Sequence, residues 1–202
     1  MRKKLILASA SPRRRELLSL ITNDFEIITR DVDERAAEID MENKGVSAVL
    51  VSEGLALLKA KAVFDELPED EKKDVLVIGA DTSVILDDEI FGKPKDKDEA
   101  VSMLSRLSGR THVVATGVAL ITAEKVKCFT EETPVEFYEY DQYQKDLIER
   151  YCSGKEPYDK AGAYGIQGGG ALLVKKIDGD FSNVVGLPVS RLAREIESVI
   201  NY

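Results

Sequence analysis

Histidine and cysteine are scarce in this sequence of 202 residues, and their scarcity excludes several kinds of site. His112 is the only histidine, and it lies at the start of a β-like run, so a serine–histidine–aspartate triad is not expected. Zinc sites usually draw on several histidine and cysteine ligands, which this chain does not offer. Cys128 and Cys152 form neither a Cys-x-x-Cys motif nor a disulfide scaffold. We expect His112 and both reduced cysteines to be structural residues.

An excess of basic residues is also missing. The 28 lysines and arginines are outnumbered by 37 aspartates and glutamates, which gives a net charge of −9. Proteins that bind DNA or RNA usually present a basic face, so a nucleic-acid polymer is not an expected partner. A small polyanion remains compatible with this charge, because a few cations that converge in a cleft can hold one.

No apolar run is long enough to span a bilayer, so we expect no membrane association. The apolar run near the N-terminus covers only Leu5 to Ala8 and is followed by three arginines, which is unlike a signal peptide and favours a cytoplasmic protein. Two nucleotide-binding motifs are missing as well. The P-loop pattern does not occur, and glycines 162, 165 and 168 do not follow a strand in the spacing of a Rossmann fingerprint.

The patterns that are present predict a mixed α/β protein, not a regular βαβ alternation. Strands are expected at 4–9, 25–29, 74–86, 111–122, 125–140 and 171–178, with a short one within 87–96. Helices are expected at 11–21, 46–67, 100–107, 141–152 and from Pro188 onward. We expect Gly79-Ala80-Asp81-Thr82 to interrupt the third long strand, and residues 30–45 to form a polar connection.

Charged residues beside the predicted turns suggest where chemistry could occur. Asp81 is expected where the strand breaks, and Lys93 lies in an extended segment before a proline. Ser9 and Arg13 flank the first strand–helix turn, where free backbone N–H groups suit a phosphate. The next two arginines are expected to form a surface cluster. Carboxylates and lysines without histidine indicate a phosphate site that depends on Mg²⁺ or Mn²⁺.

Six segments together resemble the Maf family of nucleoside triphosphate pyrophosphatases. They occur in the family's order and at its spacing: "LASASPRRRELL", "GADTSVIL", "GKPKD", "SGRTHVVATGVAL", "EPYDKAGAYGIQG" and "NVVGLP". The resemblance covers nearly the whole chain. It implies a mixed α/β fold related to the inosine triphosphatase fold. Residues 1–202 would form a single domain, with a long twisted central sheet, flanking helices, and two lobes around a cleft.

The resemblance also implies a reaction, in which a nucleoside triphosphate is cleaved between its α- and β-phosphates. The triphosphate site that it implies consists of Ser9, Arg13, Glu34, Lys59, Asp81 and Lys93. Glu34 and Lys59 are placed by their flanking patterns, "DVDE" and "LALLKAKAV". Asp81 would be the proton acceptor, Glu34 and Asp81 would hold the divalent cation, and the basic residues would neutralise the phosphates.

Within the family, "SPRR", "ADT" and "GIQG" are similar to the branch that prefers dTTP and UTP, which singles out Arg13, Thr82 and Gln167 as specificity residues. A glutamine side chain matches the O4 and N3–H edge of thymine or uracil. Two alternatives stay open: an inosine triphosphatase-like enzyme for deaminated purines, and a regulatory protein that arrests cell division by binding a division protein. A homodimer is compatible with each of them. The glycine-rich stretch is expected to wall the base pocket, with Asp159, Lys160 and Tyr164 bracing it.

Overall fold

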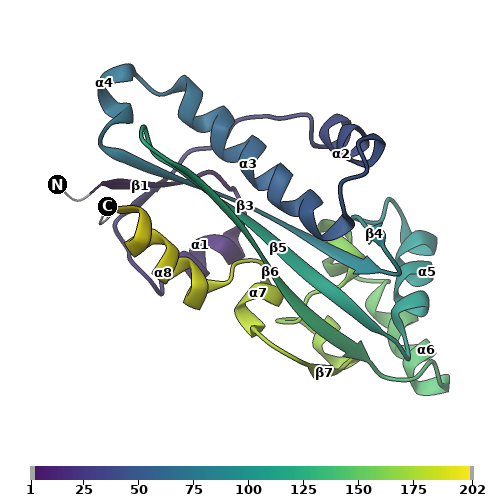
Figure 1. Ribbon diagram of the computed structural model, residues 1–202. Coiled ribbons are helices and arrows are strands. Elements are labelled where there is room, and N and C mark those ends of the chain that lie inside the picture. Colours follow the sequence, from purple (N-terminus) through teal and green to yellow (C-terminus); the bar gives the residue numbers. More distant parts are fainter. Residues whose placement is uncertain (1–2, 201–202) are drawn as a thin grey trace.

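A computed structural model describes residues 3–200 as a mixed α/β fold built on one seven-stranded sheet (Figure 1). The strand order is β2-β1-β3-β5-β6-β7, and β4 pairs with β3 outside this path. The strands are β1 (Lys4–Leu7), β2 (Phe25–Ile27), β3 (Val75–Leu86), β4 (Glu89–Phe91), β5 (Thr111–Ile121), β6 (Val126–Phe137) and β7 (Val174–Ile177). The mixed α/β class and the antiparallel β5–β6 hairpin were both predicted, and both are confirmed.

Helices cover both faces of the sheet. They are α1 (Pro12–Leu18), α2 (Glu34–Asn43), α3 (Ala48–Glu66), α4 (Glu69–Lys72), α5 (Lys97–Leu107), α6 (Gln142–Tyr151), α7 (Phe181–Val185) and α8 (Val189–Ile200). Figure 1 shows α3 along one face of the long strands and α1, α7 and α8 on the opposite face. Short 3₁₀-helices span Glu156–Asp159, Ala161–Ala163 and Gly169–Leu173. Within residues 3–200, no helix is both long and apolar enough to cross a membrane.

The predicted interruption of β3 is wrong, because the strand runs unbroken through Asp81 and Thr82. These two residues pair with Gly117 and Thr116 of β5 in continuous register. Successive side chains of a strand point to opposite faces. Asp81 therefore faces α3, and Thr82 faces α1.

On the edge of β3 opposite β5, the two neighbouring strands, β1 and β4, pair with only part of its length. β1 pairs with β3 only as far as Ile78, and β4 pairs with it only from Val84. Residues 79–83 consequently form a free edge in the middle of the sheet. This gap exposes both faces of β3 to one region of the molecule, so Asp81 and Thr82 can contribute to the same site.

Two glycines set how closely α3 approaches the sheet. A Cβ atom at Gly79 would lie 2.1 Å from the carbonyl oxygen of Ala56, and one at Gly117 would lie 2.2 Å from the backbone nitrogen of Glu53. Only glycine fits at such contacts between backbones. The close approach brings Lys59, one helical turn after Ala56, against β3.

Two further predictions about the chain's elements are wrong. Residues 30–45 contain helix α2, which Asp33 caps by accepting a hydrogen bond from the N–H of Ala36, 2.9 Å away. No residue of α2 is buried, so the segment lacks the apolar periodicity from which helices were predicted. Near the C-terminus β7 begins at Val174 instead of 171, because the preceding residues form a 3₁₀-helix.

Candidate functional site

A cavity of about 1050 Å³ lies at the gap beside β3. It is lined by the β1–α1 turn, the start of α2, Lys59 of α3, the middle of β3, the β4–α5 loop, the segment 156–168 and residues 184–186. Seven lysines and arginines but only six acidic residues line it, although acidic residues predominate in the chain. The cavity therefore concentrates positive charge in an acidic protein, as an anion site requires.

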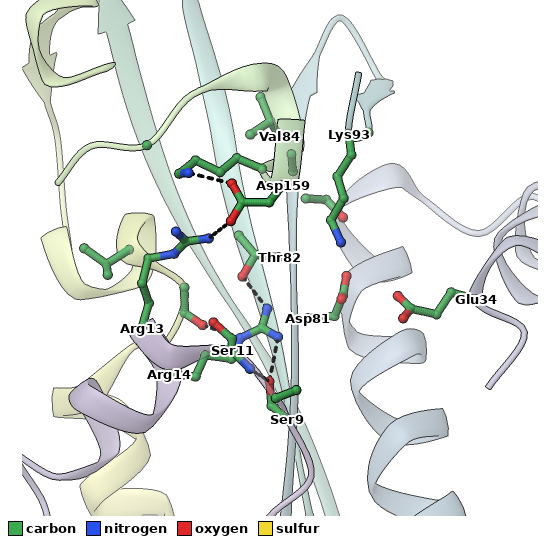
Figure 2. A pocket seen from close by; sticks show the side chains of 18 of the residues that line it. Ser9, Ser11, Arg13, Arg14, Glu34, Asp81, Thr82, Val84, Lys93 and Asp159 are labelled. Carbon is green, nitrogen blue, oxygen red and sulfur yellow. Dashed lines mark hydrogen bonds and ion pairs between the residues drawn. The ribbon is translucent and has the colours of Figure 1, made fainter. Parts of the chain in front are cut away.

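The α3 side of the cavity holds an ammonium group between two carboxylates. Lys59 Nζ lies 2.6 Å from Asp81 Oδ1 and 2.8 Å from Glu34 Oε2. The side chains of Lys59 and Asp81 are 16% and 14% exposed, whereas Glu34 at the start of α2 is 49% exposed. Figure 2 shows the carboxylates of Asp81 and Glu34 turned toward one another across the cavity.

The α1 side of the cavity is organised by Arg14. Its guanidinium donates to Ser9 Oγ at 3.3 Å and to Thr82 Oγ1 at 3.0 Å (Figure 2). It also donates to the carbonyl oxygen of Gly186 at 3.0 Å. Burial lowers the pKa of Arg14, and the charges of Asp81 and Glu34 oppose that shift. The predicted surface position is therefore wrong for Arg14, whereas Arg15 is exposed as expected.

The remaining predicted residues lie around the mouth of the cavity. Arg13 is 3.7 Å from Asp159, which also pairs with Lys160 at 2.6 Å. Lys93 is exposed, and Figure 2 shows its side chain pointing into the cavity from the β4–α5 loop. Gln167 is exposed on the segment that forms the opposite wall. The fold thus brings together Ser9, Arg13, Glu34, Lys59, Asp81, Thr82, Lys93 and Gln167, all of which line this cavity.

The carboxylates of Asp81 and Glu34 fit a hard divalent cation if substrate phosphates and water supply the remaining ligands. Asp81 and Glu34 offer the oxygen ligands that Mg²⁺ or Mn²⁺ prefers. Within residues 3–200, however, no group of three histidine, cysteine, aspartate or glutamate side chains is arranged to hold a metal ion. Mg²⁺ is often bound by one or two carboxylates together with substrate phosphates and water. The two carboxylates suit that shared mode of binding.

Comparison with known proteins identifies the family of this chain. The Maf-like protein family matches residues 4–199. The chain belongs to this family. A relative from Bacillus velezensis, named dTTP/UTP pyrophosphatase, is 48% identical over 98% of this chain and 97% of its own length. A relative of the same name from Thermosipho africanus is 47% identical over 94% of this chain and 90% of its own.

Among solved structures, the Staphylococcus aureus Ham1 protein is similar over 68% of this chain and 73% of its own, with a TM-score of 0.47 and 16% identity.

Arg14 is the residue of this Maf-family cavity that local patterns missed, although a signal for it was present. Leu17 and Leu18, three and four positions further along α1, are both buried. Residues at these spacings share one face of a helix, so Arg14 had to face inward. Arg14 and Arg15 were both predicted to be solvated from their residue type, which does not distinguish the buried face of a helix from the exposed one.

His112 lies outside this cavity and is buried, as expected of a structural residue. Its Nε2 is 2.8 Å from the hydroxyl of Tyr164, and the two rings pack edge to face with Phe137. Burial lowers the pKa of His112 to about 4, so the ring is neutral at neutral pH. The contact fixes Tyr164, which lines the cavity, to β5, in agreement with the predicted bracing role of Tyr164.

Proposed function

We propose that this chain hydrolyses dTTP and UTP to the nucleoside monophosphate and pyrophosphate, with the help of a divalent cation. One observation carries the proposal: a single cavity holds a pair of carboxylates, several converging cations and an exposed glutamine amide. The names of the relatives from B. velezensis and T. africanus support the same nucleotides.

In the proposed reaction, Asp81 accepts a proton from a water molecule that attacks the α-phosphorus. A new oxygen–phosphorus bond forms, the bond from the α-phosphorus to the bridging oxygen breaks, and pyrophosphate leaves with that oxygen. Lys59 fixes the position of the Asp81 carboxylate through their 2.6 Å contact. A cation bound by Asp81, Glu34 and the phosphates would supply electrostatic stabilisation of the charge on the phosphoryl oxygens.

The basic residues neutralise the triphosphate in this proposal. Arg13 and Lys93 reach into the cavity from opposite walls, and the guanidinium of Arg14 holds Ser9 and Thr82 beside it. Positioned cations act strongly where water is partly excluded, because no reorganisation is needed when charge develops on the leaving group. Pyrophosphate is the group that they stabilise as it departs.

The base is read by Gln167 in this proposal. Its amide presents one acceptor and two donors, which match the N3–H and O4 of uracil or thymine. Cytosine presents the reverse pattern at these two positions, so an amide held in the orientation that fits uracil would face cytosine donor to donor and acceptor to acceptor.

Pyrophosphate release from a panel of nucleotides tests the proposal. The panel contains dTTP, UTP, CTP, ITP and 7-methyl-GTP, each assayed with Mg²⁺, with Mn²⁺ and with EDTA. We expect dTTP and UTP to be preferred and EDTA to abolish turnover. Preference for ITP would instead indicate an enzyme for deaminated purines, and turnover in EDTA would contradict the metal-assisted reaction.

A further inference from the structure

The segment Gly165–Gly169 is a tight turn that carries Gln167 at its centre. The N–H of Gly168 donates to the carbonyl oxygen of Gly165 at 3.3 Å, which closes the turn. The Gln167 side chain is exposed and borders the cavity. Since the amide is attached to this short turn, its direction depends on how the turn is held.

Glu156 and Tyr151 hold the turn at both ends. Glu156 Oε2 accepts a hydrogen bond from the N–H of Gly169 at 3.1 Å. The hydroxyl of Tyr151 donates to Glu156 Oε1 at 3.2 Å and accepts from the N–H of Gly165 at 3.2 Å. The two anchored amides lie two residues before and two residues after Gln167. One carboxylate thus connects both flanks of the turn.

Glu156 and the groups around it leave no room for side chains at two glycines of this stretch. A Cβ atom at Gly168 would lie 2.1 Å from Glu156 Oε1, and one at Gly170 would lie 2.8 Å from the carbonyl oxygen of Gly165 and 3.1 Å from the Tyr151 hydroxyl. Any larger residue would displace the turn or the groups inside it. The turn is therefore folded around the Glu156–Tyr151 pair, and the absence of side chains lets it close.

The pair itself is rigidly supported. Tyr151 is a core residue at the end of α6, packed in one cluster with Leu147 and Ile148. Burial raises the pKa of its hydroxyl well above the ordinary value, so the hydroxyl keeps the proton that it donates. The backbone of Glu156 is held in turn, because Lys160 Nζ donates to its carbonyl oxygen at 2.6 Å.

We propose that Glu156 is a positioning residue for base selection: its carboxylate orients the turn so that Gln167 faces the pyrimidine edge. The inference rests on the proposed function for its choice of bases, and on the structure alone for the anchoring of the turn. Glu156 acts through Gly165 and Gly169, not on the phosphates.

Two measurements on Glu156→Ala test the proposal. Hydrogen exchange of the Gly169 amide, without nucleotide, should accelerate about ten-fold, since a lost hydrogen bond of ordinary strength changes an equilibrium by about that factor. Exchange of the Gly165 amide should accelerate less, because the Tyr151 hydroxyl still accepts its hydrogen bond. The preference for UTP over CTP in kcat/KM should fall by about the same factor, mainly through the KM of UTP. Glu156→Gln should keep most of both properties, because its amide oxygen can still accept from the N–H of Gly169.

Glu149→Ala provides the matched control. It removes another glutamate close in sequence, on α6, whose carboxylate pairs with Lys97 at 2.9 Å. We expect no change in either measurement. Tyr151→Phe removes the hydroxyl that anchors Gly165 and donates to Glu156, so it should accelerate exchange of the Gly165 amide and lower the preference for UTP. This variant keeps the proposal testable if the alanine variant does not fold.

An unchanged UTP to CTP ratio in Glu156→Ala, or an equal loss of kcat/KM for both nucleotides, would overturn the proposal, because a merely structural role lowers both alike. Glu156→Gln behaving as badly as Glu156→Ala would do the same. If the wild-type protein shows no preference for UTP, the proposed function fails instead. The exchange rates then still decide whether Glu156 anchors the turn.

Discussion

At the scale of single residues, neighbouring arginines have different positions because of helical phase. Arg14 lies above the buried leucines of α1 and bonds to three groups in the cavity, whereas Arg15 is exposed. Arg13 faces the cavity mouth and pairs with Asp159. Residue type alone does not distinguish these positions. The angle of about 100° between successive residues does, once the buried face of the helix is known.

Asp81→Asn should abolish most turnover while the protein stays folded. The amide oxygen of asparagine can still accept the hydrogen bond from Lys59, but the side chain cannot accept a proton from water. We expect kcat to fall about 10³-fold, within the range that general bases contribute. Steady-state pyrophosphate release and a thermal melt measure the two effects. Asp65→Asn, at an exposed position of α3, is the control, and near-normal turnover in Asp81→Asn would remove Asp81 from the role of base.

At the scale of elements, the site depends on where strands stop pairing. The sequence predicted β3 but placed a break in it, because glycine and aspartate commonly mark turns. The glycine instead makes room for α3, and the aspartate is held by Lys59. Local patterns could not reveal either role, since the residues that contact the glycine and the aspartate lie on α3, about twenty residues earlier in the chain. Helix α2, which presents Glu34, was missed because none of its residues is buried.

Gly117→Ala should push α3 away from the sheet and so disturb the contact between Lys59 and Asp81. The new Cβ would lie 2.2 Å from the backbone nitrogen of Glu53, where no side-chain rotation can relieve the clash. We expect the free energy of unfolding to fall by about 3 kcal/mol, as for overpacked cores, and kcat to fall as well. Urea unfolding and turnover measure both quantities.

Gly154→Ala serves as the control for this substitution, because its Cβ would be 3.4 Å from the carbonyl oxygen of Tyr151, an ordinary contact. Wild-type stability in Gly117→Ala would show that the spacing between α3 and the sheet is not constrained as described.

At the scale of the whole molecule, an acidic chain has a cavity beside β3 in which lysines and arginines slightly outnumber aspartates and glutamates. The net charge of −9 opposes binding of extended polyanions, while local convergence of lysine and arginine favours a short one. Among residues 3–200, buried apolar side chains form three clusters, which lie on both faces of the same sheet. His112 belongs to the packed region near Phe137 and Tyr164.

The stability of the molecule should fall between pH 7 and pH 5 because of His112. The pKa of His112 is about 4 when folded and 6.5 in its ordinary state, so the unfolded chain binds a proton in this window and the folded chain does not. The free energy of unfolding should decrease by about 2 kcal/mol from pH 7 to pH 5.

Urea unfolding at both values of pH measures this decrease, and His112→Gln should remove it. His112 is the only histidine, so no other histidine contributes in this window. An equal decrease in the variant would assign the effect to other groups.

The α/β class, most helices and strands, and the residues that line the cavity could be predicted from the sequence, because hydrophobic periodicity and the family's motifs are local properties of the chain. Three features became visible only in the folded chain: β3 runs unbroken past a gap between β1 and β4, Arg14 faces the cavity, and Glu156 lies inside the glycine-rich turn. Each of these features depends on contacts between segments that are distant in the sequence. The residue pattern of one segment does not show which other segment will pack against it or form its hydrogen bonds.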